Sequence, residues 1–316
     1  MSVTFGCVLS QAIYGPTASP EALRTLSQHA ERHGFNTVWF ADHIVIPLQV
    51  QSHYPYAADG ASPFAPDLPF YEPLSVLNFL AGCTQTIRLG THVLIIPYRD
   101  PIFTAKILAT IDVLSGGRLT LGAGVGWMEE EFLALGLKTF QDRGAVANEY
   151  LQLFKELWTK DAPQFEGRFC KVSGVGFQPK PVQKPHPPIW IGGHSLPALR
   201  RAARLGDGWM PIGLRPQTLL EPAELEAKIG QLRQFIRQEG RSQDAVTISF
   251  TAPVIFSTSQ GSSHVPLQGR PDEIAADFRR YRALGVSNFN INLPSEVNAQ
   301  KNMMEQFAKE IMPLVA

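Results

Sequence analysis

Residues 187–206 read PPIWIGGHSLPALRRAARLG, and this stretch holds a complete strand, turn and helix. The apolar run Pro188–Gly192 is typical of a strand that is buried on both faces of a parallel sheet. Two glycines follow, and then comes Ser195, a residue type that caps the amino termini of helices. A strand followed by a short turn and a helix predicts an α/β fold.

Working outward from this stretch, we find the same alternation along the whole chain. Together with Pro188–Gly192, eight β-rich runs alternate with helical stretches, and the other seven are Val3–Leu9, Thr37–Ile44, Ile87–Ile96, Arg118–Gly126, Gly208–Ile212, Val246–Phe256 and Asn288–Leu293. Eight such repeats favour a (β/α)8 TIM barrel, with an open doubly wound sheet as the alternative. We expect residues 1–316 to form a single barrel domain, because α/β barrels often reach this length as one domain.

Two long segments interrupt this alternation of strands and helices. Pro47–Pro69 follows the second strand, and Lys160–Pro187 comes after the fourth. Each exceeds the usual connection of about two to six residues. Barrel enzymes build their active sites at the carboxyl ends of the strands. We therefore interpret both insertions as candidate lids or substrate walls, with a tolerated surface insertion as the alternative for each.

The overall composition excludes several classes of function. The 28 basic and 28 acidic residues balance, which makes nucleic acid an unexpected partner. No apolar run approaches the roughly 20 residues that span a bilayer, and the first residues do not read as a signal peptide. The three cysteines, Cys7, Cys83 and Cys170, lie far apart and outside any metal-ligand spacing. We expect a cytoplasmic protein that acts on a small molecule, with no structural metal and no membrane contact.

Polar residues stand in two of the predicted strands. The second strand, TVWFADHIVIP at residues 37–47, ends in Asp42 and His43, which we expect at the barrel mouth. Histidine changes charge near neutral pH and is a candidate acid or base, although the pair is also compatible with an ordinary loop start. The third strand, RLGTHVLIIPYRDPI at residues 88–102, holds His92 among apolar residues. A lone histidine in such a run is more often a hydrogen-bonded core residue than a catalyst.

Glycines mark two strand ends. In RLTLGAGVGW, residues 118–127, glycines alternate with other residues, and glycine in a strand often marks close approach by a ligand or another backbone. This run lacks the spacing of a dinucleotide-binding fingerprint. After Pro188–Gly192, the turn Gly192-Gly193-His194-Ser195 opens a helix, and a helix amino terminus favours an anion. We interpret this turn as a phosphate site, with an ordinary tight turn as the alternative.

Taken in order, these motifs resemble one family. An Asp-His pair ends the second strand, GTHVLIIPYRDP covers the third and SGGRLTLGAGVGW leads into the fourth, before IWIGG and LGDGW. The ordered set resembles the bacterial luciferase-like superfamily, and within it the coenzyme F-420-dependent oxidoreductases. The resemblance covers nearly the whole chain and is weakest in the two insertions and beyond Ile212. It implies a luciferase-like TIM barrel, and a dimer is common in the family.

The resemblance also assigns roles to residues. His43 corresponds to the family's active-site histidine, and Asp42 to an acid that contacts the cofactor. His92-Val93 corresponds to a bond that is often a non-prolyl cis peptide, forming a bulge behind the cofactor ring. The remaining cofactor contacts that it implies are Val125, Gly126, Gly192, Gly193, His194 and Ser195.

The chain departs from the family pattern at one position. Deazaflavin-dependent sugar-phosphate dehydrogenases carry a glutamate just after the glycines of the fourth strand, where this chain has Trp127, followed by Glu129 and Glu130. An aromatic wall at Trp127 suits a more apolar substrate than a sugar phosphate.

These observations lead to one functional hypothesis and three alternatives. We expect hydride transfer between coenzyme F-420 and a small organic substrate, carried out by a homodimer. An FMN-dependent monooxygenase and a non-catalytic flavin-binding accessory protein are the main alternatives. A barrel lyase or aldolase needs a Schiff-base lysine or metal-binding carboxylates at the strand ends, and the eight runs show neither.

Overall fold

The segment PPIWIGGHSLPALRRAARLG folds as a strand, a turn and a helix, as the sequence predicts. In the computed structural model, which describes residues 3–9, 14–257 and 265–315, the strand is β8, Ile189–Gly192, and the helix is α6, Leu196–Leu205. Ser195 caps α6 by accepting a hydrogen bond from the backbone N–H of Ala198 at 3.4 Å. Trp209 of the next strand donates its indole N–H to the carbonyl of Gly193 at 2.7 Å and holds the turn against the sheet.

The eight predicted strands form a closed parallel barrel. Its order is β3-β2-β1-β13-β10-β9-β8-β5-β4, and a further pairing of β3 with β5 closes it. β3 and β4 are two pieces of the third strand, interrupted at His92 and Val93. The barrel strands besides β8 are β1 Thr4–Val8, β2 Thr37–Phe40, β3 Arg88–Thr91, β4 Leu94–Ile95, β5 Leu119–Gly124, β9 Gly208–Met210, β10 Thr247–Pro253 and β13 Val286–Asn292.

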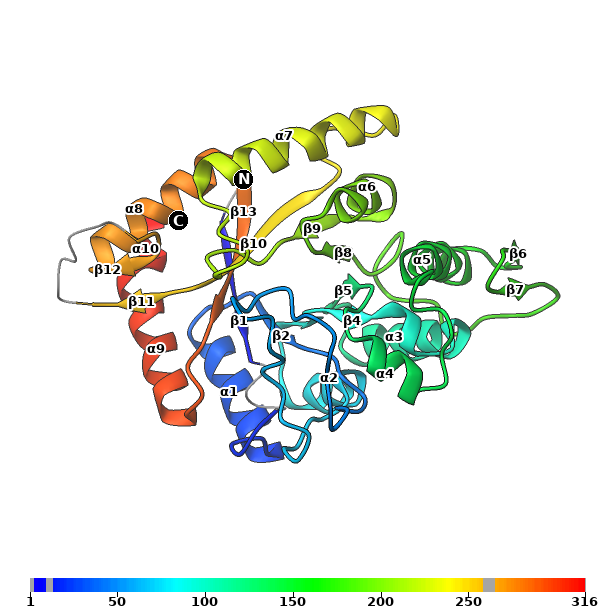
Figure 1. Cartoon of the computed structure of the whole chain (residues 1–316), viewed down its shortest axis with the longest axis horizontal. Coiled ribbons are helices and arrows are strands. Elements are labelled where there is room, and N and C mark those ends of the chain that lie inside the picture. Colours follow the sequence, from blue (N-terminus) through cyan, green and yellow to red (C-terminus); the bar gives the residue numbers. More distant parts are fainter. Residues whose placement is uncertain (1–2, 10–13, 258–264, 316) are drawn as a thin grey trace.

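Helices surround the barrel (Figure 1). α1 starts as its sequence predicts, because the Ser19 hydroxyl accepts a hydrogen bond from the N–H of Ala22 at 3.0 Å and Pro20 occupies the first helical position. The helices besides α6 are α1 Pro20–Arg32, α2 Pro73–Cys83, α3 Pro101–Leu114, α4 Glu129–Ala134, α5 Arg143–Thr159, α7 Pro222–Gln238, α8 Pro271–Ala283, α9 Val297–Glu310 and α10 Met312–Val315, with a short 3-10 turn η2 at Ile96–Tyr98.

Short strand pairs lie outside the barrel. β6, Phe165–Glu166, pairs with β7, Lys171–Val172, and β11, Ile255–Phe256, pairs with β12, Gln268–Gly269. β11 is the end of the predicted run Val246–Phe256, whereas the sequence pattern did not reveal β6, β7 and β12, which have only two residues each.

The two insertions lie in different places. Pro47–Pro69 connects β2 to α2, and its side chains Tyr54, Tyr56 and Phe64 line a cavity at the carboxyl ends of the strands. For Lys160–Pro187 the structure favours the alternative of a surface insertion, because none of its residues lines this cavity. The segment starts after α5, its residues Arg168 and Phe169 pack back along that helix against Glu149, and Gln183 bonds to Asp112 and to the carbonyl of Leu119 at the amino end of β5.

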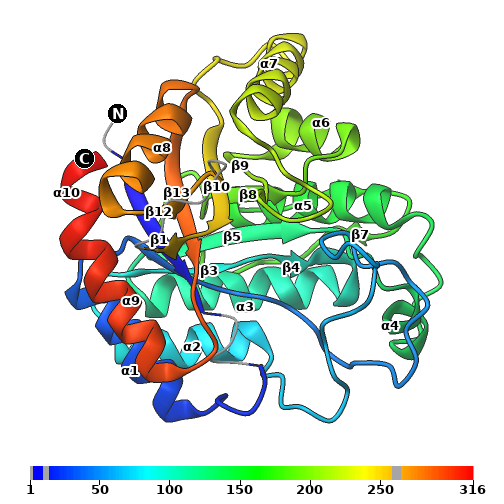
Figure 2. The ribbon, with the colours of Figure 1, turned by 60° about the vertical axis from the view of Figure 1, so that its left-hand side comes forward.

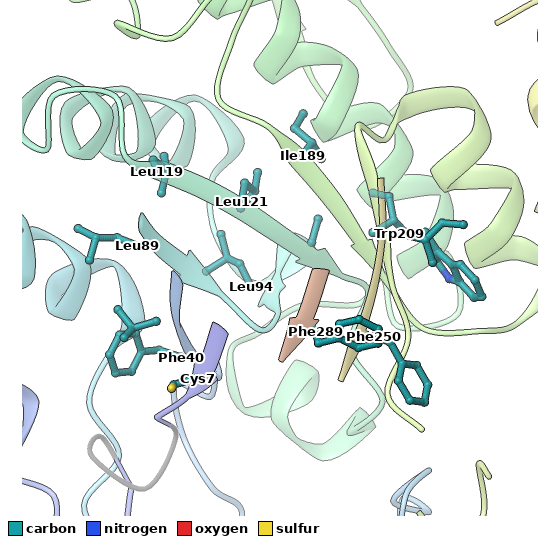
Figure 3. Close-up of a cluster of buried hydrophobic side chains, with 14 of the residues drawn as sticks. Cys7, Phe40, Leu89, Leu94, Leu119, Leu121, Ile189, Trp209, Phe250 and Phe289 are labelled. Carbon is teal, nitrogen blue, oxygen red and sulfur yellow. The ribbon is translucent and has the colours of Figure 1, made fainter. Parts of the chain in front are cut away.

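Outward-facing strand residues form the main core between the barrel and its helices. Figure 3 shows side chains of this layer on successive strands, among them Cys7, Phe40, Leu121, Ile189 and Phe289. All five are at most 1% exposed. Along β1 and β2, Cys7 and Phe40 belong to this outer layer, whereas Val8 and Trp39 pack in a separate cluster with Met210. The alternation of a strand therefore separates an outer apolar core from an inner layer.

The inner layer contains a buried chain of hydrogen bonds. Trp39 donates its indole N–H to Asn290 at 2.7 Å, and Asn290 donates to Ser249 at 2.8 Å and to Thr251 at 3.3 Å. The chain reaches the mouth of the barrel, where the hydroxyl of Thr251 lies 2.9 Å from Nε2 of His92. Because buried polar groups are costly unless they are paired, this network holds the position of each side chain in it.

In the described part of the chain, none of the helices combines the length and apolar character of a membrane span.

Candidate active site

A cavity opens at the carboxyl ends of the barrel strands, the end at which the sequence predicts the site. Its walls come from β2, the β3–β4 break, β8, β9 and the segment Pro47–Pro69. The described residues that line it are Ala41, Asp42, His43, Tyr54, Tyr56, Phe64, His92, Val93, Ile95, Trp127, Gly192, Gly193, Met210 and Ile212. Six predicted site residues, from three separate strands, therefore meet here together with Trp127.

The peptide bond between His92 and Val93 is cis, which confirms the prediction from the sequence. The side chain of Val93 points between β5 and β8. A Cβ atom at Gly124 would meet Val93 at 2.3 Å, and one at Gly192 would meet it at 2.8 Å. Gly122 leaves room in the same way for the carbonyl of Thr91, at 1.9 Å. Gly122 and Gly124 therefore make room for the interrupted third strand, so of the two interpretations, approach by a ligand or by another part of the chain, the structure shows the second.

His43 forms a buried pair with Glu131 of α4. Its Nδ1 lies 2.6 Å from Oε2 of Glu131, and the two side chains are 6% and 0% exposed. The same carboxylate oxygen accepts a hydrogen bond from the hydroxyl of Tyr98 at 2.9 Å. Its other oxygen accepts from the backbone N–H groups of Ile44 at 2.7 Å and Val45 at 3.3 Å. Glu131 therefore fixes both the backbone after His43 and the plane of its imidazole.

This pairing determines which nitrogen of His43 is available for chemistry. When Nδ1 donates its proton to Glu131, the lone pair lies on Nε2, on the opposite side of the ring. His43 lines the cavity, so Nε2 is the atom at which a proton can be taken up or held. A histidine oriented by a buried carboxylate is a common arrangement for a general base.

Asp42 precedes His43 in the chain, but its carboxylate is fully engaged in hydrogen bonds within the protein. Arg99 donates to its two carboxylate oxygens at 2.7 Å each, and the N–H of Ile95 donates at 2.8 Å. Arg99 also bonds Glu72 at 2.9 Å. Asp42 therefore ties β2 to the break in the third strand, and its role as a cofactor contact stays a prediction.

His92 is neutral at physiological pH. Burial lowers its pKa to about 4, and the nearby Arg215 acts in the same direction. Its Nε2 is held by the hydroxyl of Thr251 at the end of the inner hydrogen-bond chain. A neutral, anchored imidazole acts here as a rigid part of the cavity wall.

The turn after β8 has features of an anion cradle. Gly192 and Gly193 line the cavity without side chains, and Gly193 has a φ of +91°, which favours glycine. Nδ1 of His194 is buried and has no hydrogen-bond partner among the described residues. Burial and the nearby Lys228 lower the pKa of His194. Glu224 acts on this pKa in the opposite direction. A backbone without side chains and an unsatisfied imidazole nitrogen thus lie together at the start of α6.

Aromatic rings close the cavity on its outer side. Tyr54 packs against Trp127 with ring centroids 5.1 Å apart, and Phe64 packs against His43 at 4.4 Å. Burial raises the pKa of Tyr56 to about 12, so its hydroxyl keeps its proton over the physiological range. The wall over His43 is therefore apolar and uncharged.

Four predicted cofactor contacts lie outside the described cavity lining, namely Val125, Gly126, His194 and Ser195. Gly126 has a φ of +84° and its carbonyl accepts a bond from Arg143 at 3.2 Å. Sequence reasoning missed Glu131 and Tyr98, although Tyr98 stands inside the quoted run GTHVLIIPYRDP. The run of three glutamates, 129–131, was a signal for Glu131, but it did not show which one faces inward.

Comparison with known proteins assigns the chain to a family. Residues 3–262 match the model of the luciferase-like monooxygenases. An uncharacterised protein of Mycobacterium tuberculosis is 34% identical over 222 residues, covering 70% of this chain and 76% of that protein. The FMNH(2)-dependent dimethylsulfone monooxygenase of Pseudomonas putida is 29% identical over 214 residues, covering 67% of this chain and 54% of that enzyme.

Two further similarities extend along nearly the full chain. The F420-dependent glucose-6-phosphate dehydrogenase of Kineococcus radiotolerans is 24% identical over 335 residues, covering 94% of each chain. Among solved structures, a monooxygenase of Streptomyces bottropensis has a TM-score of 0.78 at 21% identity, covering 99% of this chain and 100% of its own. The chain belongs to the luciferase-like monooxygenase family, whose members are monooxygenases or F420-dependent oxidoreductases.

Proposed function

We propose that this chain transfers hydride between coenzyme F-420 and a small, largely apolar organic substrate. The observation that carries the proposal is the buried His43–Glu131 pair, which presents Nε2 of His43 to a cavity walled by aromatic rings and floored by Gly192 and Gly193. When bound, the deazaflavin ring supplies the hydride donor or acceptor. His43 exchanges the accompanying proton with the substrate.

The residues at the cavity fit such a cofactor chemically. Gly193 leaves room for the chain of a cofactor, because within 4 Å an added Cβ atom there would meet only the Cβ atom of Ala198, at 3.5 Å. The unsatisfied Nδ1 of His194, the next residue, offers a polar contact to a phosphate. The enclosed volume is about 140 Å³, whereas pockets that hold ligands of this size measure roughly 300 Å³ or more. We infer that the segment Pro47–Pro69 moves outward when the cofactor enters.

The contacts of this segment are compatible with such a movement. Apart from its aromatic packing, it is held at one side by hydrogen bonds from the N–H groups of Gln51 and Ser52 to Glu130, at 2.7 and 2.9 Å, and from the N–H of Glu129 to the Ser52 hydroxyl at 3.0 Å. The Tyr14 hydroxyl donates to the carbonyl of Pro63 at 2.9 Å and accepts from the N–H of Ala65 at 3.0 Å. Gln217 donates to the carbonyl of Ala58 at 3.0 Å, and the N–H of Gly15 donates to the carbonyl of Pro69 at 3.0 Å. These bonds are exposed or partly exposed, so water can replace them at little cost.

A basic groove favours coenzyme F-420 over FMN. FMN ends at its phosphate, whereas F-420 continues beyond the phosphate into a tail of carboxylates. A surface groove lined by Arg200, Arg201 and Arg204 begins at Pro197, two residues after Ser195. Arg201 is fixed by Asn148 at 2.6 Å and by the carbonyl of Gly144 at 3.0 Å. These guanidinium groups are placed to pair with an acidic tail that leaves the cradle along α6.

The substrate class follows from the cavity wall. Trp127, Tyr54, Tyr56 and Phe64 present rings to the space beside His43, and no lysine or arginine is among the described residues that line it. Arg215 acts on His92 and Tyr54 from outside this lining, so a sugar phosphate would find no cation in the cavity wall itself, and a charged substrate loses its hydration on entry. We therefore propose uncharged ketones, enones or secondary alcohols with an apolar body.

The FMN-dependent monooxygenase remains the second candidate, because the relative from Pseudomonas putida uses FMNH(2). A non-catalytic accessory role is disfavoured, because such a protein has no use for a buried carboxylate that orients a cavity histidine.

The test is a pair of fluorescence titrations of the protein with F-420 and with FMN. We expect F-420 to bind at micromolar concentration or below and FMN to bind at least tenfold more weakly. The double variant Arg200→Gln/Arg204→Gln should weaken F-420 and leave FMN unchanged. Equal affinities in wild type would favour the second candidate, and no binding of either cofactor would refute the proposal. Turnover of phenylethanol and cyclohexenone, with glucose 6-phosphate as the polar comparison, then tests the substrate class.

A further inference from the structure

The first and the last long helices of the chain lie side by side. Figure 2 shows α9 along α1, where the ring of helices closes between the two ends of the chain. His29 lies in the last turn of α1, and His33 is the residue that ends this helix. Glu305 lies on α9. This group is separate from the active site, because the last turn of α1 lies at the amino ends of the barrel strands.

The three side chains converge on one point. One ligand atom from each of His29, His33 and Glu305 lies within 4.8 Å of the other two. Nε2 of His29 is 3.2 Å from Oε1 of Glu305, and the two imidazole rings have centroids 4.3 Å apart. Ligand atoms around a tetrahedral ion with bonds of about 2.1 Å are separated by about 3.4 Å. Side-chain movements of about 1 Å would therefore complete the set.

The hydrogen bonding of the two histidines points to a ligand. His29 is 7% exposed, yet its Nε2 has no hydrogen bond of good geometry among the described residues, although the carboxylate of Glu305 and the backbone of Lys301 are both nearby. Nδ1 of His33 lies 2.9 Å from the carbonyl of His29. A nitrogen at this distance donates its proton, so the lone pair of His33 lies on Nε2. Metal-binding histidines are commonly fixed by such a bond from the other ring nitrogen.

We propose that His29, His33 and Glu305 bind a divalent transition-metal ion, and Zn²⁺ in particular. Two imidazole nitrogens and one carboxylate oxygen are ligands that Zn²⁺ accepts, whereas Mg²⁺ and Ca²⁺ prefer oxygen ligands alone. Glu305 is exposed, which gives an ion access from solvent and leaves a fourth position for water. The ion would join the first and last long helices and stabilise the closure of the barrel.

Arg32 is the group that opposes binding. Its Nη2 lies 3.5 Å from Nδ1 of His29, where a metal-bound imidazole must carry its proton. Because Arg32 is exposed, its side chain can turn into solvent when the ion binds. Removing this cation should therefore strengthen binding, which a purely structural role of the histidines does not predict.

The experiment uses the full chain, freed of metal with EDTA and then dialysed. Thermal unfolding is followed with no metal, with ZnCl2 and with MgCl2, and CoCl2 serves as a spectroscopic probe. We expect Zn²⁺ at about 100 times its Kd to raise Tm by about 4 °C, with one ion per chain and no effect of Mg²⁺. Co²⁺ should give the visible absorption bands of a tetrahedral site.

Four variants decide the outcome. His33→Gln and Glu305→Gln should abolish the Zn²⁺-induced rise in Tm, Glu310→Gln on the same helix should keep it, and Arg32→Gln should lower the Kd for Zn²⁺ by about threefold or more. Each metal-free variant is unfolded alongside, so that a loss of stability is not mistaken for a loss of binding. If Zn²⁺ and Co²⁺ leave wild type unchanged at millimolar concentration, or if His33→Gln retains the full rise, the site does not exist.

Discussion

The substitution Glu131→Gln exchanges one carboxylate oxygen for an amide group in a fully buried side chain that orients His43. The backbone N–H groups of Ile44 and Val45 can only donate, so the amide oxygen must stay on their side. The new NH2 group then faces Tyr98 and His43. Both donate to the carboxylate in wild type, and both can accept a hydrogen bond from the amide instead. His43 accepts at Nδ1, and its proton moves to Nε2.

The magnitude follows from this change of tautomer. With a proton on Nε2, the atom that faces the cavity can no longer accept one, and a well-placed base contributes about 10²- to 10⁴-fold in rate. We therefore expect kcat to fall by about that factor. The pocket keeps its shape, so the Kd for F-420 should change by less than about threefold. Exchanging bonds to a charged group for neutral ones should cost about 1–2 kcal/mol of stability.

The assay follows the visible absorbance of F-420 during turnover of phenylethanol, over a range of pH, together with Tm and the cofactor Kd. The matched control is Glu129→Gln, on the same helix, because its carboxylate takes no part in the bonds to His43. The control should keep the activity of wild type. If Glu131→Gln keeps the kcat and the pH profile of wild type, the argument for His43 as a base is refuted.

Three further changes test other parts of the site. His43→Ala should lower kcat by about 10²- to 10⁴-fold with Tm and cofactor Kd nearly unchanged; a lowered Tm with intact activity per folded molecule would show a structural role instead. Gly193→Ala places a side chain at a φ of +91°, which costs roughly 1–3 kcal/mol of stability. We expect the cofactor Kd measured by fluorescence titration to rise about tenfold. An unchanged Kd would show that the phosphate binds elsewhere. For His92, burial lowers the pKa to about 4 from an ordinary value near 6.5, so protonation opposes folding and this group's stabilisation is lost as pH falls from about 6.5 towards 4. The loss amounts to about 3 kcal/mol, and His92→Gln should be less sensitive to pH in urea unfolding over this window; an identical pH dependence would exclude His92 as its source.

The sequence by itself determined the barrel. Each of the eight predicted strands is a strand in the structure, because most strands buried on both faces of a parallel sheet are mainly apolar and stand out from the helical stretches between them. The cis peptide at His92-Val93 was also predicted from the resemblance of GTHVLIIP to a known pattern. For Lys160–Pro187 the sequence left a lid and a surface insertion open, because the length of a segment does not say whether it reaches the barrel mouth, and the structure favours the surface insertion. Its position depends on α5, which carries the chain back before the segment starts.

The pairings within the site were decided only by the tertiary structure. Asp42 and His43 were visible as polar residues at a strand end, but their partners Arg99 and Glu131 lie 57 and 88 residues further along the chain. Local pattern carries no information on such contacts, since they depend on how α4 packs over the mouth of the barrel. The same holds for the glycines of the fourth strand. Their spacing did not reveal that Gly124 makes room for the side chain of Val93. Sequence periodicity specifies which faces are buried, whereas close packing of distant segments decides which polar atoms meet.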